Sequence, residues 1–127
     1  MLTIDGALYP LHLAIGTRWK LHYLSAEMAD EPKRREEEAG FLADPRAALG
    51  GEAIVRLEAI RDALALDFGG IDFGFTRDGT LVVFEANATM VMVPLAADAK
   101  WDYRRMAFDN VFAAVRTMLL HRAHERA

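Results

Sequence analysis

The sequence contains no cysteine, and this absence excludes disulfide bonds, thiolate metal sites and a cysteine nucleophile. It also lacks an apolar run near the roughly 20 residues that a membrane-spanning helix needs, and a basic stretch followed by an apolar one at its start. Positive charge is not in excess, because the net charge is −4 and the pI is about 5.5. We therefore expect a cytoplasmic protein that has neither nucleic acid nor a membrane as its partner.

The length and composition are those of one globular domain. The chain has 127 residues, of which 53% are hydrophobic and 27% are charged. This is enough for a single modest core and too little for two ordinary domains. We expect one domain over residues 1–127.

About three helices are predicted from apolar spacing and capping residues. Asp30 resembles an N-cap, and Pro32 in the first turn begins a helix that runs to about Ala43. Its EPKRREEEAG run predicts a solvated face with ion pairs four residues apart, Arg34 with Glu38 among them. Residues 40–51 are rich in glycine and contain a proline, which is typical of a connector.

Two further helices follow from apolar residues at helical spacing, one over residues 52–66 and one over residues 102–122. The residues expected to face inward are Ala53, Ile54, Leu57, Ile60 and Leu64 in the first of them, and Met106, Val111, Val115, Met118 and Leu119 in the second.

A first β-hairpin is predicted over residues 8–23, where apolar and polar residues alternate around a turn at residues 16–18. Its more polar side carries His12, Lys20 and His22.

The stretch GGIDFGFTRDGTLVVFEANAT, residues 69–89, predicts a second hairpin around a two-residue Asp78-Gly79 turn. A four-residue loop, Arg77 to Thr80, would give the same register. In that register Asp72 lies directly opposite Glu85, with the two β-carbons about 5 Å apart. Asn87 falls beside them on the same face. We therefore expect an α+β fold, in which two hairpins build an antiparallel sheet and the helices pack on one face of it.

The other face of this hairpin should meet the core. Its residues are Ile71, Phe73, Phe75, Val82, Phe84 and Ala86. On the carboxylate face, Gly70 and Gly74 flank Asp72 and are expected to leave room for a bulky ligand.

Two like charges directly opposite on a sheet are destabilising, so this pair needs a reason. A cation offers one, because carboxylate and amide oxygens are ligands that Mg²⁺ accepts together with water or phosphate. The alternative is that Asp72 and Glu85 are ordinary polar residues on the wet side of an antiparallel sheet.

The combination of GGIDFGF, a turn and LVVFEANAT resembles the last catalytic hairpin of ATP-grasp ligases. The earlier stretch YPLHLAIGTRWKLHYLSAEM looks like a strand pair of the same C-terminal subdomain, so the resemblance covers about residues 1–95. It implies that Asp72, Glu85 and Asn87 bind the magnesium ions that bridge the phosphates of ATP. It also implies the reaction: ATP phosphorylates a carboxylate, and an amine or thiol then attacks the acyl-phosphate.

The resemblance further implies roles for the polar side of the first hairpin. His12 is a candidate for binding the nucleotide, and Lys20 and His22 are candidates for contacting phosphate or substrate during catalysis. Many members of the family carry an arginine where this chain has Gly70. The subdomain that supplies the nucleotide lid normally precedes the matched segment, and we expect it to be absent here, which leaves half of an ATP site that is inactive alone.

Three functions are therefore open. The first is the metal- and nucleotide-binding half of an ATP-grasp ligase. The second is a non-catalytic domain that pairs with itself or with a partner, for which Trp19, Trp101 and Tyr103 are candidate interface residues. The third is an unrelated metal-dependent hydrolase, for which no histidine lies at ligand spacing near Asp72.

Overall fold

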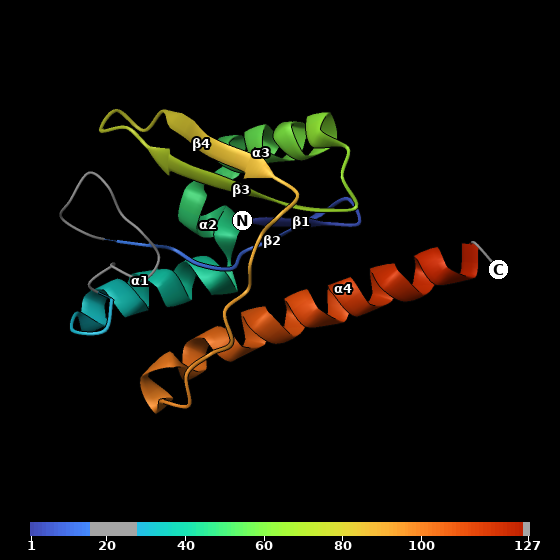
Figure 1. The fold of residues 1–127 in the computed structure, drawn as a ribbon. Helices are drawn as coiled ribbons and strands as arrows, with labels where there is room; N and C mark the ends of the chain where they lie inside the picture. Colours follow the sequence, from blue (N-terminus) through green and yellow to red (C-terminus); the bar gives the residue numbers. More distant parts are fainter. Residues whose placement is uncertain (16–27, 126–127) are drawn as a thin grey trace.

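The computed structural model describes residues 1–15 and 28–125, which form an α+β fold around a four-stranded antiparallel sheet of order β2-β1-β3-β4 (Figure 1). The predicted fold class is confirmed. The strands are β1 (Leu2–Ile4), β2 (Ala7–Tyr9), β3 (Phe68–Phe75) and β4 (Leu81–Asn87). The helices are α1 (Pro32–Ala43), α2 (Pro45–Leu49), α3 (Gly51–Leu64), the 3₁₀ helix η2 (Ala99–Arg104) and α4 (Arg105–Glu125).

The first hairpin, β1–β2, lies earlier in the chain than predicted. Its turn is Asp5-Gly6, and both residues have a positive φ, 47° and 76°. This Asp-Gly pair is the same hairpin signal that marks the second hairpin, so the sequence did contain the information. Residues 10–15 form no strand, which makes the predicted first strand wrong beyond Tyr9, and residues 16–23 lie outside the described part of the chain.

The larger core lies between the sheet and the helices α1 to α3, and Ala107 near the start of α4 also belongs to it. Phe41 of α1, Leu57 of α3 and Ile71 of β3 are its least exposed members, at 0–1%. The inward-facing residues predicted for α3 are confirmed, since Ala53, Ile54 and Leu57 are buried and Ile60 and Leu64 pack against this core.

The connector predicted over residues 40–51 contains the short helix α2. Pro45 occupies its first turn, and the carboxylate of Asp44 accepts a hydrogen bond from the Ala47 N–H at 2.9 Å. These are the proline and N-cap signals of a helix start. At the start of α1 the cap is Glu31 rather than the predicted Asp30, and its side chain makes no capping hydrogen bond.

Helices cover both faces of the sheet, whereas the sequence predicted helices on one face. Leu2 and Ile4 of β1 point away from the larger core and pack with Val111 and Met118 of α4. Figure 1 shows α4 on the side of the sheet opposite α3. The physical reason is the central position of β1, whose residues are buried on both faces and therefore need a cover on each.

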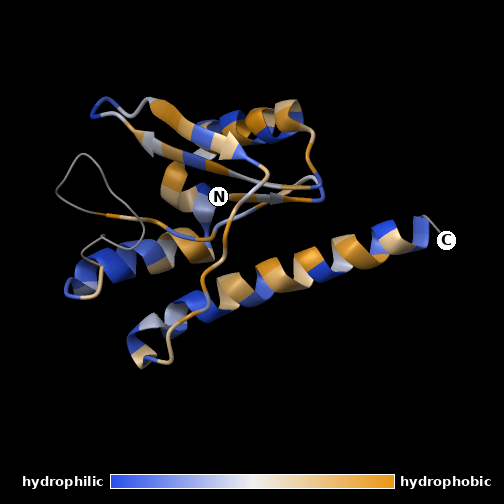
Figure 2. Cartoon of the chain, viewed as in Figure 1, coloured by the Kyte–Doolittle hydropathy of each residue, from blue (hydrophilic) through white to orange (hydrophobic). Residues whose placement is uncertain are grey.

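Helix α4 packs on β1 and β2 through a narrow side, and this leaves much of it exposed. Val111 and Met118 are buried as predicted, and Val115 packs beside them. Met106 and Leu119 are 63% and 58% exposed, so their predicted inward positions are wrong. Figure 2 shows hydrophobic residues recurring along the whole length of α4.

The β3–β4 loop is one residue longer than predicted. It consists of residues 77–79 and is closed by a hydrogen bond from the Thr76 N–H to the Thr80 carbonyl at 3.0 Å. Gly79 has a φ of 82°, the left-handed conformation that ends a three-residue hairpin loop. By itself this loop would shift the pairing of the two strands by one residue.

A bulge in β4 reverses that shift. Phe73 pairs with Val83 but Asp72 pairs with Glu85, so Phe84 is an extra residue without a partner in β3. Beyond the bulge the pairing is the predicted one, because the two single-residue shifts cancel. The opposition of Asp72 and Glu85 is confirmed, although the predicted two-residue turn is wrong.

The bulge also moves side chains of β4 between the two faces. Leu81 lies an even number of residues from Glu85, so the predicted register would put both on the carboxylate face, but Leu81 packs against the larger core. Phe84 and Val82, expected in the core, are 71% and 37% exposed, and Phe75 is 44% exposed. Between the loop and the bulge β4 is shifted by one residue, and such a shift exchanges the faces of the side chains there, so Val82 and Phe84 leave the predicted core surface. Phe75 belongs to β3, whose faces this shift does not change.

Candidate functional site

The carboxylate cluster consists of Asp72, Glu85 and Asn87, and the structure brings all three together. Asp72 and Glu85 are opposite one another and both exposed, on the sheet face against which α4 packs mainly through β1 and β2. Asn87 pairs with Gly70, one step along the same face. Its amide nitrogen donates a hydrogen bond to Glu85 Oε1 at 2.7 Å, and its amide oxygen accepts one from the Thr89 N–H at 3.0 Å. Asn87 therefore orients Glu85.

The space beside the cluster is filled by side chains of this chain, whereas Gly70 and Gly74 were expected to leave room for a ligand there. A β-carbon added to Gly70 would lie 2.3 Å from Met90 Cγ, so the Met90 side chain lies directly on this glycine. A β-carbon added to Gly74 would lie 2.8 Å from Phe84 Cζ. Both glycines admit neighbouring side chains of this chain rather than a ligand.

This packing predicts the effect of Gly70→Ala. The new methyl group would displace Met90 from the sheet, and we expect a loss of about 1–3 kcal/mol in the free energy of unfolding, measured by urea denaturation. The double variant Gly70→Ala with Met90→Ala should recover most of that loss. Gly40→Ala in α1 is the control, because open space surrounds Gly40 and a helical alanine is favoured by about 0.5–1 kcal/mol. Equal, favourable effects of both single variants would contradict the Met90 contact.

The cluster fits a hydrated divalent cation better than a closed metal site. Two exposed carboxylates face each other, and the Asn87 oxygen has a second lone pair beyond its bond to Thr89. Within residues 1–15 and 28–125 no group of three or more histidine and acidic side chains is placed to hold a metal ion. A cation here would keep water or phosphate oxygens as its other ligands, as Mg²⁺ commonly does.

A second polar cluster, which the sequence interpretation missed, surrounds Glu38 of α1. This residue is fully buried, although its charged run predicted a solvated face. Its Oε2 accepts hydrogen bonds from Arg104 Nε at 3.0 Å and Nη2 at 2.6 Å, and from the Tyr103 hydroxyl. Its Oε1 contacts His12 Nδ1 and accepts the Leu13 N–H at 3.2 Å. The network joins α1, η2 and residues 12–13.

The ionisation of this network follows from its contacts. Burial alone would raise the pKa of Glu38, but the hydrogen bonds from His12, Tyr103 and Arg104 lower it below its usual value of 4.5. Burial and the hydrogen bond to Glu38 raise the pKa of Tyr103 to about 12. The guanidinium of Arg104 also lies 4.4 Å from the ring centroid of Trp101. The network is therefore a charged carboxylate held by fixed donors.

The other residues predicted to act at the site lie away from the carboxylate cluster or outside the described part of the chain. His12, predicted to bind the nucleotide, is held by Glu38 and is only 14% exposed. Arg34 was expected to pair with Glu38 and instead donates to the Ile15 carbonyl at 3.4 Å. Lys20 and His22, the predicted catalytic residues, lie outside the described residues, as does Trp19.

The predicted interface aromatics in the described part make contacts within the chain. Trp101 packs on Arg104, and Tyr103 donates its hydroxyl to Glu38. A charged residue among charged neighbours gives no sequence signal of burial. The partners of Glu38 are all 25 or more residues away along the chain.

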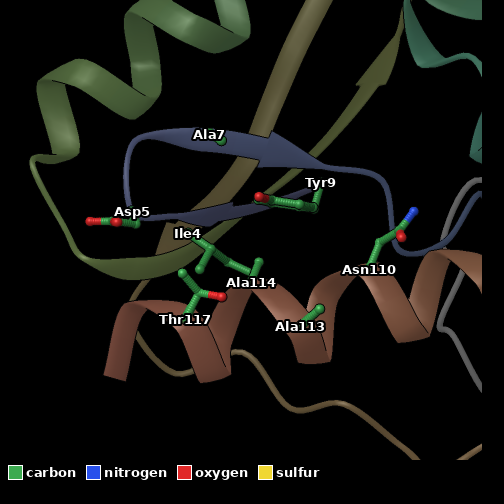
Figure 3. Close-up of a pocket in the computed structure, with 8 residues that line it drawn as sticks. All are labelled: Ile4, Asp5, Ala7, Tyr9, Asn110, Ala113, Ala114 and Thr117. Carbon is green, nitrogen blue, oxygen red and sulfur yellow. The ribbon is translucent and has the colours of Figure 1, made fainter. Parts of the chain in front are cut away.

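A shallow cavity of about 430 Å³ lies apart from both clusters, between the β1–β2 hairpin and α4 (Figure 3). Asp5, Tyr9, Asn110 and Thr117 supply its polar groups, and Ile4 and alanines supply the rest. Asp72, Glu85 and Asn87 do not line it. The carboxylate cluster is therefore an open surface site and not the floor of this cavity.

Comparison of the chain with protein-family models, with curated proteins and with solved structures finds no match. The resemblance to ATP-grasp ligases therefore depends on the residues of the hairpin itself. None of the helices in the described ranges is both long and apolar enough to cross a membrane.

Proposed function

We propose that this chain supplies the cation- and nucleotide-binding half of an ATP-grasp-type ligase. One observation carries the proposal: Asp72 and Glu85 lie directly opposite each other on an uncovered part of the sheet, with Asn87 bonded to Glu85. The two carboxylates repel each other, and the Met1 ammonium offsets part of the charge of Asp72 only. The arrangement matches the Asp and Glu-x-Asn pattern that the hairpin resembles. Asp72 and Glu85 would hold Mg²⁺, and Asn87 would fix the direction of the Glu85 carboxylate.

The chemistry at such a site is positioning and charge neutralisation. Bound Mg²⁺ neutralises phosphate oxygens so that a carboxylate can approach the γ-phosphate. The exposure of both carboxylates leaves the outer ligand positions of the cation for phosphate and water. A second element must cover this face to exclude water during the reaction, because the described helices do not cover it. We therefore expect cation binding, but no ligation, from the chain alone.

Calorimetric titration with Mg²⁺, followed by Mg-ATP, tests the proposal. The unaltered chain should bind Mg²⁺, and Asp72→Asn and Glu85→Gln should each weaken that binding by about tenfold or more, since each removes one of two charged ligands. Glu36→Gln is the control, because it removes an exposed carboxylate of α1. An unaltered chain that binds neither Mg²⁺ nor Mg-ATP would contradict the proposal.

Stability without metal gives an independent readout of the same site. Removing one of two opposed charges should raise the free energy of unfolding of metal-free Asp72→Asn by about 0.2–1 kcal/mol. A clear loss of stability would instead give Asp72 a structural role, as a hydrogen-bond acceptor or as the charge that acts on the buried Met1 ammonium. Added Mg²⁺ should stabilise the unaltered chain and not the variant.

A second candidate function, a non-catalytic domain that associates with a partner, is favoured by exposed apolar residues in β4 and in the segment that follows it. Phe84 and Val91 are 71% and 79% exposed, and Val93 is 44% exposed. Large apolar side chains gathered on one surface commonly mark an interaction site. A stable complex or dimer that binds no Mg-ATP in the titration would favour this function over the first.

A further inference from the structure

Helix α4 has a second apolar side that the fold does not use. Phe112, Leu119 and Leu120 are 55%, 58% and 49% exposed, while Val111 and Met118 of the same helix are buried. Phe112 and Leu119 are seven residues apart and therefore lie on one stripe of the helix, two turns apart. Isolated exposed leucines need no explanation, but a stripe of this kind is typical of a helix that packs against a partner.

Two charged residues on the same stripe lie on either side of Phe112. Asp109 is three residues before Phe112, and Arg116 is four residues after it, so all three share one side of the helix. Both charged residues are exposed. Within the described ranges neither of them forms an ion pair. The stripe therefore presents a negative charge, an aromatic ring and a positive charge in that order.

This order is complementary to itself when a second copy runs antiparallel. A register that aligns Asp109 of one copy with Arg116 of the other also aligns Arg116 with Asp109, because the pair is related by a twofold axis. The two Phe112 rings then lie next to each other at the axis, at the level of the small residue Ala113. A parallel pair would instead bring Asp109 against Asp109 and Arg116 against Arg116. Charge therefore selects the antiparallel arrangement.

We infer that α4 is the interface of a symmetric antiparallel homodimer, centred on Phe112 and flanked by two reciprocal Asp109–Arg116 ion pairs. The overlapping stretch, residues 105–120, is about 24 Å long at 1.5 Å per residue. A contact of this size belongs to the smaller class of interfaces, so a dissociation constant on the order of micromolar is expected. This inference does not depend on cation or nucleotide binding at the carboxylate cluster.

Sedimentation equilibrium of the full chain over a concentration series tests the dimer. The unaltered chain should show a monomer–dimer equilibrium, and Phe112→Glu should weaken it by about tenfold or more, because it places two like charges at the axis. Val55→Glu is the matched control, since Val55 is 58% exposed on α3. Circular dichroism and urea denaturation establish that each variant is folded.

Charge reversal tests the antiparallel register itself. Asp109→Arg and Arg116→Asp should each weaken the dimer by about tenfold, because each places like charges opposite each other. The double variant carrying both changes should return to within about threefold of the unaltered chain, since the reciprocal pairs are rebuilt with reversed signs. A folded double variant that stays monomeric overturns this register. An unaltered chain that is monomeric throughout, or a dimer that Phe112→Glu leaves unchanged, overturns the interface.

Discussion

Glu38→Gln is expected to lower the free energy of unfolding by about 3–5 kcal/mol, because it removes one partner of a buried ion pair. Arg104 is only 6% exposed and would keep its charge with no carboxylate beside it. The glutamine amide has only one acceptor oxygen, so its NH2 group faces either the Leu13 N–H or the donors of Tyr103 and Arg104. The hydrogen bonds that the two carboxylate oxygens accept therefore cannot all be kept. Such a loss is a large part of the stability of a small domain.

The neighbouring residue supplies the control for this experiment. Glu37→Gln removes a carboxylate from the exposed side of α1 and should change the stability by no more than about 0.5 kcal/mol. A double variant, Glu38→Leu with Arg104→Met, should recover much of the loss, because an apolar pair leaves no buried charge. A Glu38→Gln chain within about 1 kcal/mol of the unaltered one in urea denaturation would show that the network contributes little.

The pH dependence of stability follows from the lowered pKa of Glu38. The folded-state pKa lies below the usual value of 4.5, so the unfolded chain binds the proton more readily than the folded chain does. The contribution of the network is complete above about pH 4.5 and is lost as the pH falls through the folded-state value. We therefore expect the unaltered chain to lose more stability than Glu38→Gln over this acidic range.

Leu57→Ala is expected to lower the free energy of unfolding by about 2–5 kcal/mol. Leu57 is 0% exposed and lies in the larger core with Phe41 and Ile71, so its removal leaves a cavity between α3, α1 and the sheet. Because this core joins the helices to β3, the loss should appear as one cooperative shift of the whole urea unfolding transition. The midpoint should fall and the slope should stay unchanged.

Val55→Ala is the matched control on the same helix. Val55 is 58% exposed, two residues from Leu57, and its truncation should cost no more than about 0.5 kcal/mol. If Val55→Ala and Leu57→Ala lowered the free energy of unfolding by similar amounts, the face of α3 that carries Leu57 would not be the one that packs in the core.

The opposition of Asp72 and Glu85 could be predicted from the sequence, but the loop length and the bulge that produce it could not. Pairing from an Asp-Gly turn gave the right partners only because a three-residue loop and the Phe84 bulge shift the register in opposite directions. The bulge has no sequence signal of its own, since Phe84 stands in an ordinary run of strand-forming residues. This is also why Leu81, Val82 and Phe84 of β4 were assigned to the wrong faces.

The sequence by itself determined the α+β class, the position of α3 and its buried face, and the pairing of the two carboxylates. These features depend on local periodicity and on turn residues, which act over a few positions of the chain. Only the tertiary structure decided that Glu38 is buried, that Met90 fills the space above Gly70 and that α4 covers the second face of the sheet. Each of these depends on residues brought together from distant parts of the chain, and local patterns contain no information about such encounters.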